Sequence, residues 1–130
     1  MTFMRVALVF ATAFILASCV TPEQMQKVYD SQEEPTPGVK AAVIKHVREN
    51  FFDPYSIRDA QISNVVSLPG TALKAVCIRA NGKNRFGAYI GLTYTSVRLQ
   101  GGVAVSSLQN APACADGRMR FYPFPELERL

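Results

Sequence analysis

The sequence predicts an α+β domain in which one main helix packs on a three- to four-stranded antiparallel meander stapled by one disulfide. Apolar residues recur at helical spacing from Gly38 to Phe52, whereas apolar and polar residues alternate with a period of two from Ile57 onward. Two cysteines, Cys77 and Cys114, lie far apart in the strand-rich half. A helix followed by a run of strands is typical of a two-layer domain.

The N-terminus carries an export pattern. Arg5 precedes an apolar run over residues 6–17, which is shorter than the about 20 residues that a membrane span needs. The run ends in Leu16-Ala17-Ser18-Cys19, which resembles the bacterial lipobox. The resemblance implies that residues 1–18 are a signal peptide, that the Cys19 thiol receives a diacylglyceryl group, and that the freed amine is acylated, typically with palmitate. The alternative is an N-terminal anchor helix with an incidental cysteine.

The residue after the lipobox bears on location. In Gram-negative lipoproteins an aspartate there tends to retain the protein at the inner membrane, and this chain has Val20. The resemblance therefore implies a lipid-anchored protein of the outer membrane that faces the periplasm, with the inner membrane as the alternative. Two or three acyl chains anchor stably because each buried CH₂ contributes about 0.8 kcal/mol.

Residues 19–37 are interpreted as a lipidated tether and residues 38–130 as one small periplasmic domain. The three prolines of the tether break regular structure, although a short helix near Glu23–Tyr29 is compatible with its sequence. Removal of residues 1–18 leaves 130 − 18 = 112 residues, which suffice for one small domain and not for two.

The main helix is expected to end at Asp53-Pro54, because the residue before a proline is disfavoured in the helical region. Strands are expected over residues 60–68, 73–80, 85–99 and 103–107. His46 is interpreted as a surface or boundary residue of the helix, because no carboxylate or thiol partner for it can be named.

A tight hairpin turn is expected at Asn81-Gly82-Lys83-Asn84, because Asn-Gly supplies the positive φ angles that such a turn needs. In the long strand that follows, Gly87 and Gly91 indicate a bend, a bulge or a close approach of another backbone. Residues 109–117 are expected to form a loop, and residues 121–125 an extended apolar segment laid against the body. Five residues of the long strand are expected to face the core and the helix: Phe86, Ala88, Ile90, Leu92 and Tyr94.

The cysteine count fits an exported protein once Cys19 carries lipid. Cys77 and Cys114 then remain, and two cysteines in an oxidising periplasm predict one disulfide. Closing this long loop stabilises the fold by roughly 4 kcal/mol. A metal site is not expected, since the chain has a single histidine and no CxxC pair. A reactive redox pair is the other alternative, but such cysteines usually lie close in sequence.

Basic residues are concentrated in the second half of the chain. The formal charge of +4 becomes 13 − 10 = +3 without Arg5, and seven basic residues between Lys74 and Arg120 are opposed by Asp116 alone. Anionic lipid headgroups, cell-wall carboxylates or an acidic protein patch are the expected partners, and nucleic acid is not. The alternative is a solvated basic face without a specific partner. The candidate binding residues are Lys83, Arg85, Tyr89, Arg98, Arg118 and Arg120.

A second resemblance rests on three segments, Phe52-Asp53-Pro54-Tyr55-Ser56, Val76-Cys77-Ile78 and Asn81-Gly82-Lys83-Asn84-Arg85-Phe86-Gly87-Ala88-Tyr89-Ile90-Gly91. They resemble a recurring group of small bacterial lipoproteins whose function is not established. In that group a helix leads to an Asp-Pro-x-Ser turn, and a cysteine-bearing strand enters an Asn-x-Lys-Asn…Gly-x-Tyr-x-Gly hairpin. The resemblance covers roughly residues 40–95, and Gly82 stands where the pattern has alanine. It implies no activity, substrate or site.

Together these features predict a membrane-anchored binding or scaffolding module of the cell envelope, without catalysis or cofactor. Its contact surface is expected at the Asn81–Arg85 hairpin, Tyr89 and the tail Phe121–Phe124. The alternative is an inhibitor of secreted hydrolases, whose hairpin would enter the cleft of its target. An enzyme is not expected, because the carboxylates are scattered along the chain and neither a serine–histidine–aspartate set nor a nucleophile elbow is evident.

Overall fold

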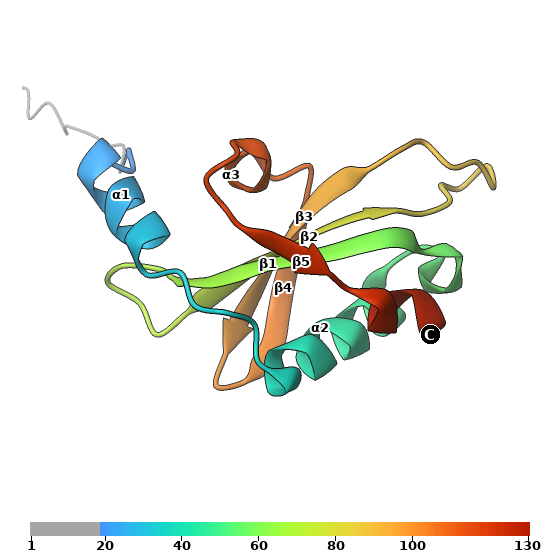
Figure 1. The fold of residues 1–130 in the computed structure, drawn as a ribbon, viewed down its shortest axis with the longest axis horizontal. Helices are drawn as coiled ribbons and strands as arrows, with labels where there is room; N and C mark the ends of the chain where they lie inside the picture. The colour runs from blue at the N-terminus through green and yellow to red at the C-terminus, as the bar shows by residue number, and fades with distance from the viewer. Residues whose placement is uncertain (1–18) are drawn as a thin grey trace, which may run out of the picture.

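The computed structural model describes residues 19–130 and shows an α+β domain with one five-stranded antiparallel sheet of order β4-β3-β2-β1-β5 (Figure 1). The fold class is confirmed, with one strand more than expected. The signal peptide assigned to residues 1–18 lies outside the described residues. The α-helices are α1 (Pro22–Asp30), α2 (Pro37–Asn50) and α3 (Pro112–Ala115), and the 3₁₀ helices are η1 (Pro54–Ser56) and η2 (Pro125–Arg129). The strands are β1 (Arg58–Ser67), β2 (Lys74–Asn81), β3 (Thr93–Gln100), β4 (Val103–Gln109) and β5 (Phe121–Pro123).

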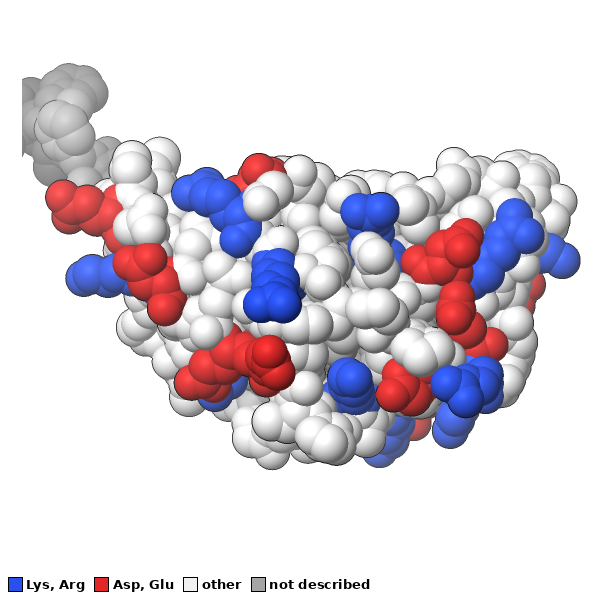
Figure 2. All heavy atoms as spheres, in the orientation of Figure 1, with Lys and Arg blue, Asp and Glu red and all other residues white. Residues whose placement is uncertain are grey.

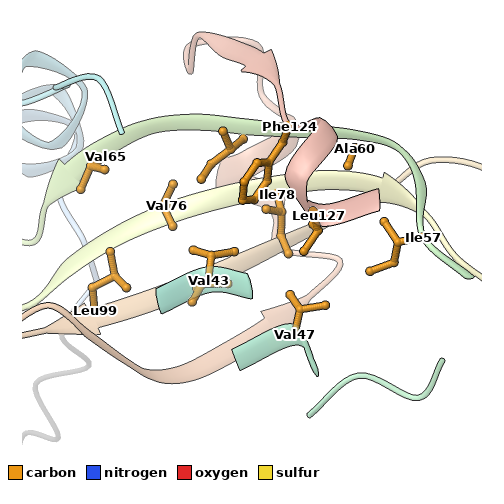
Figure 3. Close-up of a cluster of buried hydrophobic side chains, with 12 residues drawn as sticks. Val43, Val47, Ile57, Ala60, Val65, Val76, Ile78, Leu99, Phe124 and Leu127 are labelled. Carbon is orange, nitrogen blue, oxygen red and sulfur yellow. The ribbon is translucent and has the colours of Figure 1, made fainter. Parts of the chain in front are cut away.

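Helix α2 covers one face of the sheet. It begins after Thr36, whose hydroxyl accepts a hydrogen bond from the Val39 amide, as N-cap residues do. Val43 and Val47 on its inner side are fully buried, and Figure 3 shows them facing Ile78 of β2. The main helix predicted from the sequence is therefore confirmed to within two residues at its C-terminal end.

The C-terminal tail is part of the sheet and of the core, and is more than a segment laid on the surface. Residues Phe121–Pro123 form β5, an edge strand that pairs antiparallel with β1. Phe124 and Leu127 follow it and are fully buried in the same apolar cluster as α2 (Figure 3). Pro123 is compatible with this strand because β5 lies at the edge, where one side of the backbone needs no ladder partner.

A disulfide joins Cys77 of β2 to Cys114 of α3 on the other face of the sheet, with Cα atoms 5.7 Å apart, which confirms the predicted pairing. Both cysteines belong to a second buried cluster that includes Tyr29 and Met119. Residues 109–117 were expected to be an irregular loop. They contain the short helix α3 instead, which carries Cys114 onto the sheet.

Residues 22–33 of the predicted tether are folded against the body, and the short helix compatible with residues 23–29 is present as α1. Thr21 and Gln24 satisfy each other's backbone amides in a capping box, which starts α1 at Pro22. The helix ends with a buried Tyr29, and Glu33 then exchanges two backbone hydrogen bonds with Val65 of β1. Tertiary contacts therefore hold this segment, and only two residues separate Cys19 from α1.

The predicted tight turn at Asn81–Asn84 is wrong, and the long strand predicted over 85–99 is confirmed only for its second half, residues 93–99. β2 ends at Asn81 and β3 begins at Thr93, and residues 82–92 between them form an irregular loop, named the arm below. The chain reverses at Asn84–Gly87, where the Gly87 amide donates to the Asn84 carbonyl and Gly87 adopts a φ of 73°. The Asn84 side chain accepts the amides of Phe86 and Ala88, which a strand ladder would otherwise have used.

The prediction that the apolar residues of this segment face the core is also wrong. Phe86, Ile90 and Leu92 are 92%, 63% and 45% exposed, because their segment leaves the sheet before it can reach α2. Tyr94 is in β3 but packs edge-on against Phe121, in the cluster on the face opposite α2. The alternating apolar residues over 86–92 therefore belong to an exposed loop and not to a buried strand.

Candidate functional site

The arm is held against the body by Tyr89. The Tyr89 hydroxyl donates a 2.7 Å hydrogen bond to the Ser56 carbonyl, and the Lys83 amide donates to the Ser56 hydroxyl. The Arg58 guanidinium lies 3.5 Å from the centre of the Tyr89 ring, and the Lys83 ammonium lies 5.6 Å from it. These contacts give Tyr89 a positioning role in the arm, whereas the sequence had suggested a contact residue.

A hollow of about 540 Å³ lies between the arm, residues 50–53, and the ends of β2, β3 and β4. It exists because α2 ends at Asn50 while the sheet beneath continues. Its floor includes the buried side chains of Ile57, Ile78 and Thr95. This hollow is named the end groove.

The walls of the end groove carry both charged and apolar side chains. The arm contributes Lys83, Asn84, Arg85 and Ile90, and the segment between α2 and η1 contributes Phe52. A concave surface with apolar walls and a few polar groups is the usual form of a ligand or peptide site. Lys83 and Arg85 were predictable from the sequence as binding residues, whereas the groove was not, because its two sides lie about thirty residues apart in the chain.

Exposed apolar side chains gather at this end of the molecule. Of nine large hydrophobic residues that are exposed among residues 19–130, five come from η1, its flank and the arm. The remaining four are Val20 and three residues of the edge strand β4. The five are Phe52, Tyr55, Phe86, Ile90 and Leu92. Such a concentration marks an interaction site more often than an isolated exposed residue does.

The arm and α1 lie at opposite ends of the longest axis of the molecule (Figure 1). Cys19, which is exposed and outside the disulfide, precedes α1 directly. Figure 2 shows that acidic and basic side chains are interspersed over most of this view. Any attachment through Cys19 therefore leaves the arm at the far end of the domain.

The six candidate binding residues do not form one surface. Lys83, Arg85 and Tyr89 are together in the arm, whereas Arg98 lies on β3 facing Ser106 of β4. The last two lie near α1 and β5 and are engaged within the fold. Arg118 pairs with Asp116 at 3.0 Å and lies 4.0 Å from the Tyr29 ring, and Arg120 lies 5.1 Å from the Tyr122 ring.

Tyr29, Asp116 and Arg118 form a polar cluster that fastens α1 to α3. The Tyr29 hydroxyl donates to the Asp116 carboxylate, which also accepts from the Arg118 side chain and amide. Burial and the bond to Asp116 raise the pKa of Tyr29 to about 12. Burial opposes ionisation of Asp116, but the bonds from Tyr29 and Arg118 outweigh it and hold the Asp116 pKa below its usual value.

The raised Tyr29 pKa predicts a loss of stability in alkali. The folded state gains from the protonated phenol below pH 10, the ordinary tyrosine value, and this gain disappears as the pH rises through about 12. Tyr29→Phe should remove one ionisation near pH 12 from an absorbance titration and lessen the alkaline loss of stability. Tyr55→Phe, at an exposed tyrosine, is the control. A variant curve that keeps the step near pH 12 would contradict the assignment.

His46 is buried, with 8% of its surface exposed, so the expectation of a surface or boundary histidine is wrong. Its Nε2 lies 2.9 Å from the Ser107 hydroxyl, and its Nδ1 lies 3.3 Å from Nδ2 of Asn50. A serine, a histidine and an asparagine in this order invite comparison with a hydrolytic triad.

The orientation of Asn50 favours a polarity opposite to that of a hydrolytic triad. Asn50 Nδ2 donates to the His46 carbonyl at 2.8 Å, which fixes the amide nitrogen on the side of the ring. Nδ1 of His46 then accepts, so the ring proton lies on Nε2 and is donated to Ser107. A general base would need a free Nε2 lone pair. The trio therefore joins α2 to β4, with the His46 ring between Ser107 and Asn50.

Asn84 is expected to control the order of the arm. Asn84→Ala removes the acceptor of the Phe86 and Ala88 amides, so these amides should exchange with deuterium roughly fivefold faster, as for the loss of a bond worth about 1 kcal/mol. Peptide-level exchange over residues 82–92 measures the effect. Arg85→Ala, which keeps the Asn84 side chain, serves as the control, and equal rates in both variants would argue against this cap.

Comparisons with known proteins leave the chain without an assigned family. No protein-family model matches it, and neither a curated protein nor a solved structure shows significant similarity to it. Within residues 19–130, no helix is long and apolar enough to span a bilayer. The same residues hold no cluster of three histidine, cysteine or acidic side chains that would bind a metal ion.

Proposed function

We propose that this chain is a membrane-anchored lipoprotein of the bacterial envelope that acts as a binding or scaffolding module, with the arm and the end groove as its contact surface. The observation that carries the proposal is the gathering of five exposed apolar residues at the end away from Cys19, where Phe52 and Ile90 also line the end groove. Folded proteins rarely keep five large apolar side chains exposed at one end unless a partner covers them.

The anchor rests on the lipobox resemblance of Leu16-Ala17-Ser18-Cys19. Cys19 is exposed and unpaired, whereas Cys77 and Cys114 form a disulfide. The Cys19 thiol is therefore free to accept a lipid. Val20 supports a destination at the outer membrane. Incorporation of labelled palmitate and fractionation of the two membranes test both points. Cys19→Ser should abolish labelling and release the protein from the membrane, and retention of label in that variant would refute the anchor.

Binding without catalysis is supported by the polarity of the histidine cluster. The His46 ring donates to Ser107 and accepts from Asn50, so it acts as a structural link between α2 and β4. The arm, by contrast, presents side chains that lack partners in the fold, above all Phe86, which is 92% exposed.

In-cell photo-crosslinking tests the contact surface. A photoreactive residue replaces Phe86 or Arg85 in the arm, and Ala115 on α3, also exposed, is the matched control. A discrete adduct from the arm positions, absent from Ala115, would support the proposal and identify the partner by mass spectrometry. An adduct with a secreted hydrolase would favour the inhibitor alternative. The same smear from all three positions, or none, would rule out the arm as a protein-contact surface.

A further inference from the structure

The arm combines one sign of charge with apolar side chains. Residues 82–92 contain Lys83 and Arg85 and no acidic residue. Phe86 stands at the apex of the turn with 92% of its surface exposed, and Ile90 on the returning limb is 63% exposed. An apolar tip flanked by cations is suited to a surface that is anionic outside and apolar beneath.

The shape of the apex favours a lipid surface over a protein partner. The turn at Asn84–Gly87 is a small convex projection. A stable protein interface covers about 800 Å² on each partner, far more than one turn offers. A fluid bilayer needs no matching pocket, because acyl chains rearrange around an inserted ring.

The arm is also pre-ordered for such a contact. Asn84 caps the turn through two amides, and Tyr89 ties the returning limb to Ser56. Phe86 is therefore exposed on an ordered turn, and its insertion requires little further ordering.

The position of the arm relative to Cys19 indicates which membrane it meets. In Figure 1 the start of α1, α3 and the arm all reach the upper side of the domain, and α2 lies on the lower side. A flat bilayer placed against this upper side would contact both the lipid anchor at Cys19 and the arm. Only Val20 and Thr21 connect Cys19 to α1, so the domain remains next to the membrane that anchors it.

We infer that the arm apex docks on the anionic surface of the same bilayer that holds Cys19, so that the domain lies flat with two points of attachment. Phe86 enters the acyl boundary, Lys83 and Arg85 meet the phosphate groups, and α2 faces away from the membrane. The inference rests on the proposed lipid anchor and names the partner of the proposed contact surface.

The test uses a single tryptophan and a single free thiol. The chain contains no tryptophan, and Cys19 is the free cysteine beside the Cys77–Cys114 disulfide. The chain from Cys19 onward, which contains both apolar clusters, is coupled through this thiol to a maleimide lipid in phosphatidylglycerol vesicles. Phe86→Trp reports the apex, and Val103→Trp, at a residue 59% exposed on β4, is the matched control. Lipids brominated in the acyl chain quench any tryptophan that inserts.

Quenching and a blue shift for Phe86→Trp, without either for Val103→Trp, are the expected result. Adding Lys83→Gln and Arg85→Gln should shift the arm about thirtyfold toward the undocked state, and zwitterionic vesicles should have a similar effect. Absence of quenching for Phe86→Trp, or equal quenching at both positions, would overturn the inference. A discrete protein adduct in the crosslinking experiment without quenching here would leave the binding module standing and refute the lipid contact alone.

Discussion

Replacing both bridged cysteines, as Cys77→Ser with Cys114→Ser, is expected to lower the free energy of unfolding by roughly 4 kcal/mol. The two positions are 37 residues apart, and the disulfide removes the entropy that the unfolded chain would gain in that loop. A loss of this size is a large share of the 5–15 kcal/mol that small domains typically have. Urea unfolding followed by circular dichroism measures it.

The double cysteine variant should also loosen the elements that pack around the disulfide. Cys114 sits on α3, which meets the sheet within the second apolar cluster, and Tyr29 of α1 packs there as well. The double variant should therefore raise deuterium exchange in α1 and α3 more than in α2. Cys19→Ser, which keeps the disulfide, is the control and should unfold like the parent chain. Equal stability of the double variant and the parent would show that the covalent link contributes little.

Phe124→Ala should cost about 3–5 kcal/mol, as for a large aromatic removed from a core. Phe124 is fully buried in the cluster that α2 and the sheet share, and Figure 3 shows its ring beside Leu127 and Ile78. Its removal leaves a cavity that β5 and η2 can only partly close. Thermal or urea unfolding measures the loss.

Phe86→Ala is the matched control, since it removes the same ring from a site that is 92% exposed. It should change stability by no more than about 0.5 kcal/mol, in line with exposed positions generally. The pair separates two views of the chain, because the sequence pattern placed Phe86 in the core and Phe124 in a surface tail. A larger loss for Phe86→Ala than for Phe124→Ala would contradict the fold described above.

Short-range residue spacing correctly predicted the main helix and several strands. The main helix followed from apolar spacing and the Asp53-Pro54 stop, and α2 ends within a few residues of it. The period of two identified the segments of β1 and β2, and the short strand expected over 103–107 is part of β4. The disulfide followed from cysteine counting, which needed no geometry.

The arm shows where periodicity misled. Alternating apolar residues over 85–92 are compatible with a strand, but the Asn84 side chain takes the backbone amides that a ladder would need. Lys83 and Arg85 were correctly placed together as candidates, whereas Arg118 and Arg120 proved to be engaged with Tyr29 and Tyr122. The Tyr29 ring lies 89 residues from Arg118 in the chain, so no local signal could have shown that Arg118 stacks on it.

The sequence by itself determined the α+β class, the main helix, the cysteine pairing and the acid-free, basic arm, since each depends on residue type and short-range spacing. Only the tertiary structure decided that α1 is fastened to α3, that the tail completes the sheet, and that the end groove forms beyond Asn50. These features join residues that are 30–90 positions apart. Their stability comes from packing and hydrogen bonds that exist only after the chain has folded, so composition and period cannot reveal them.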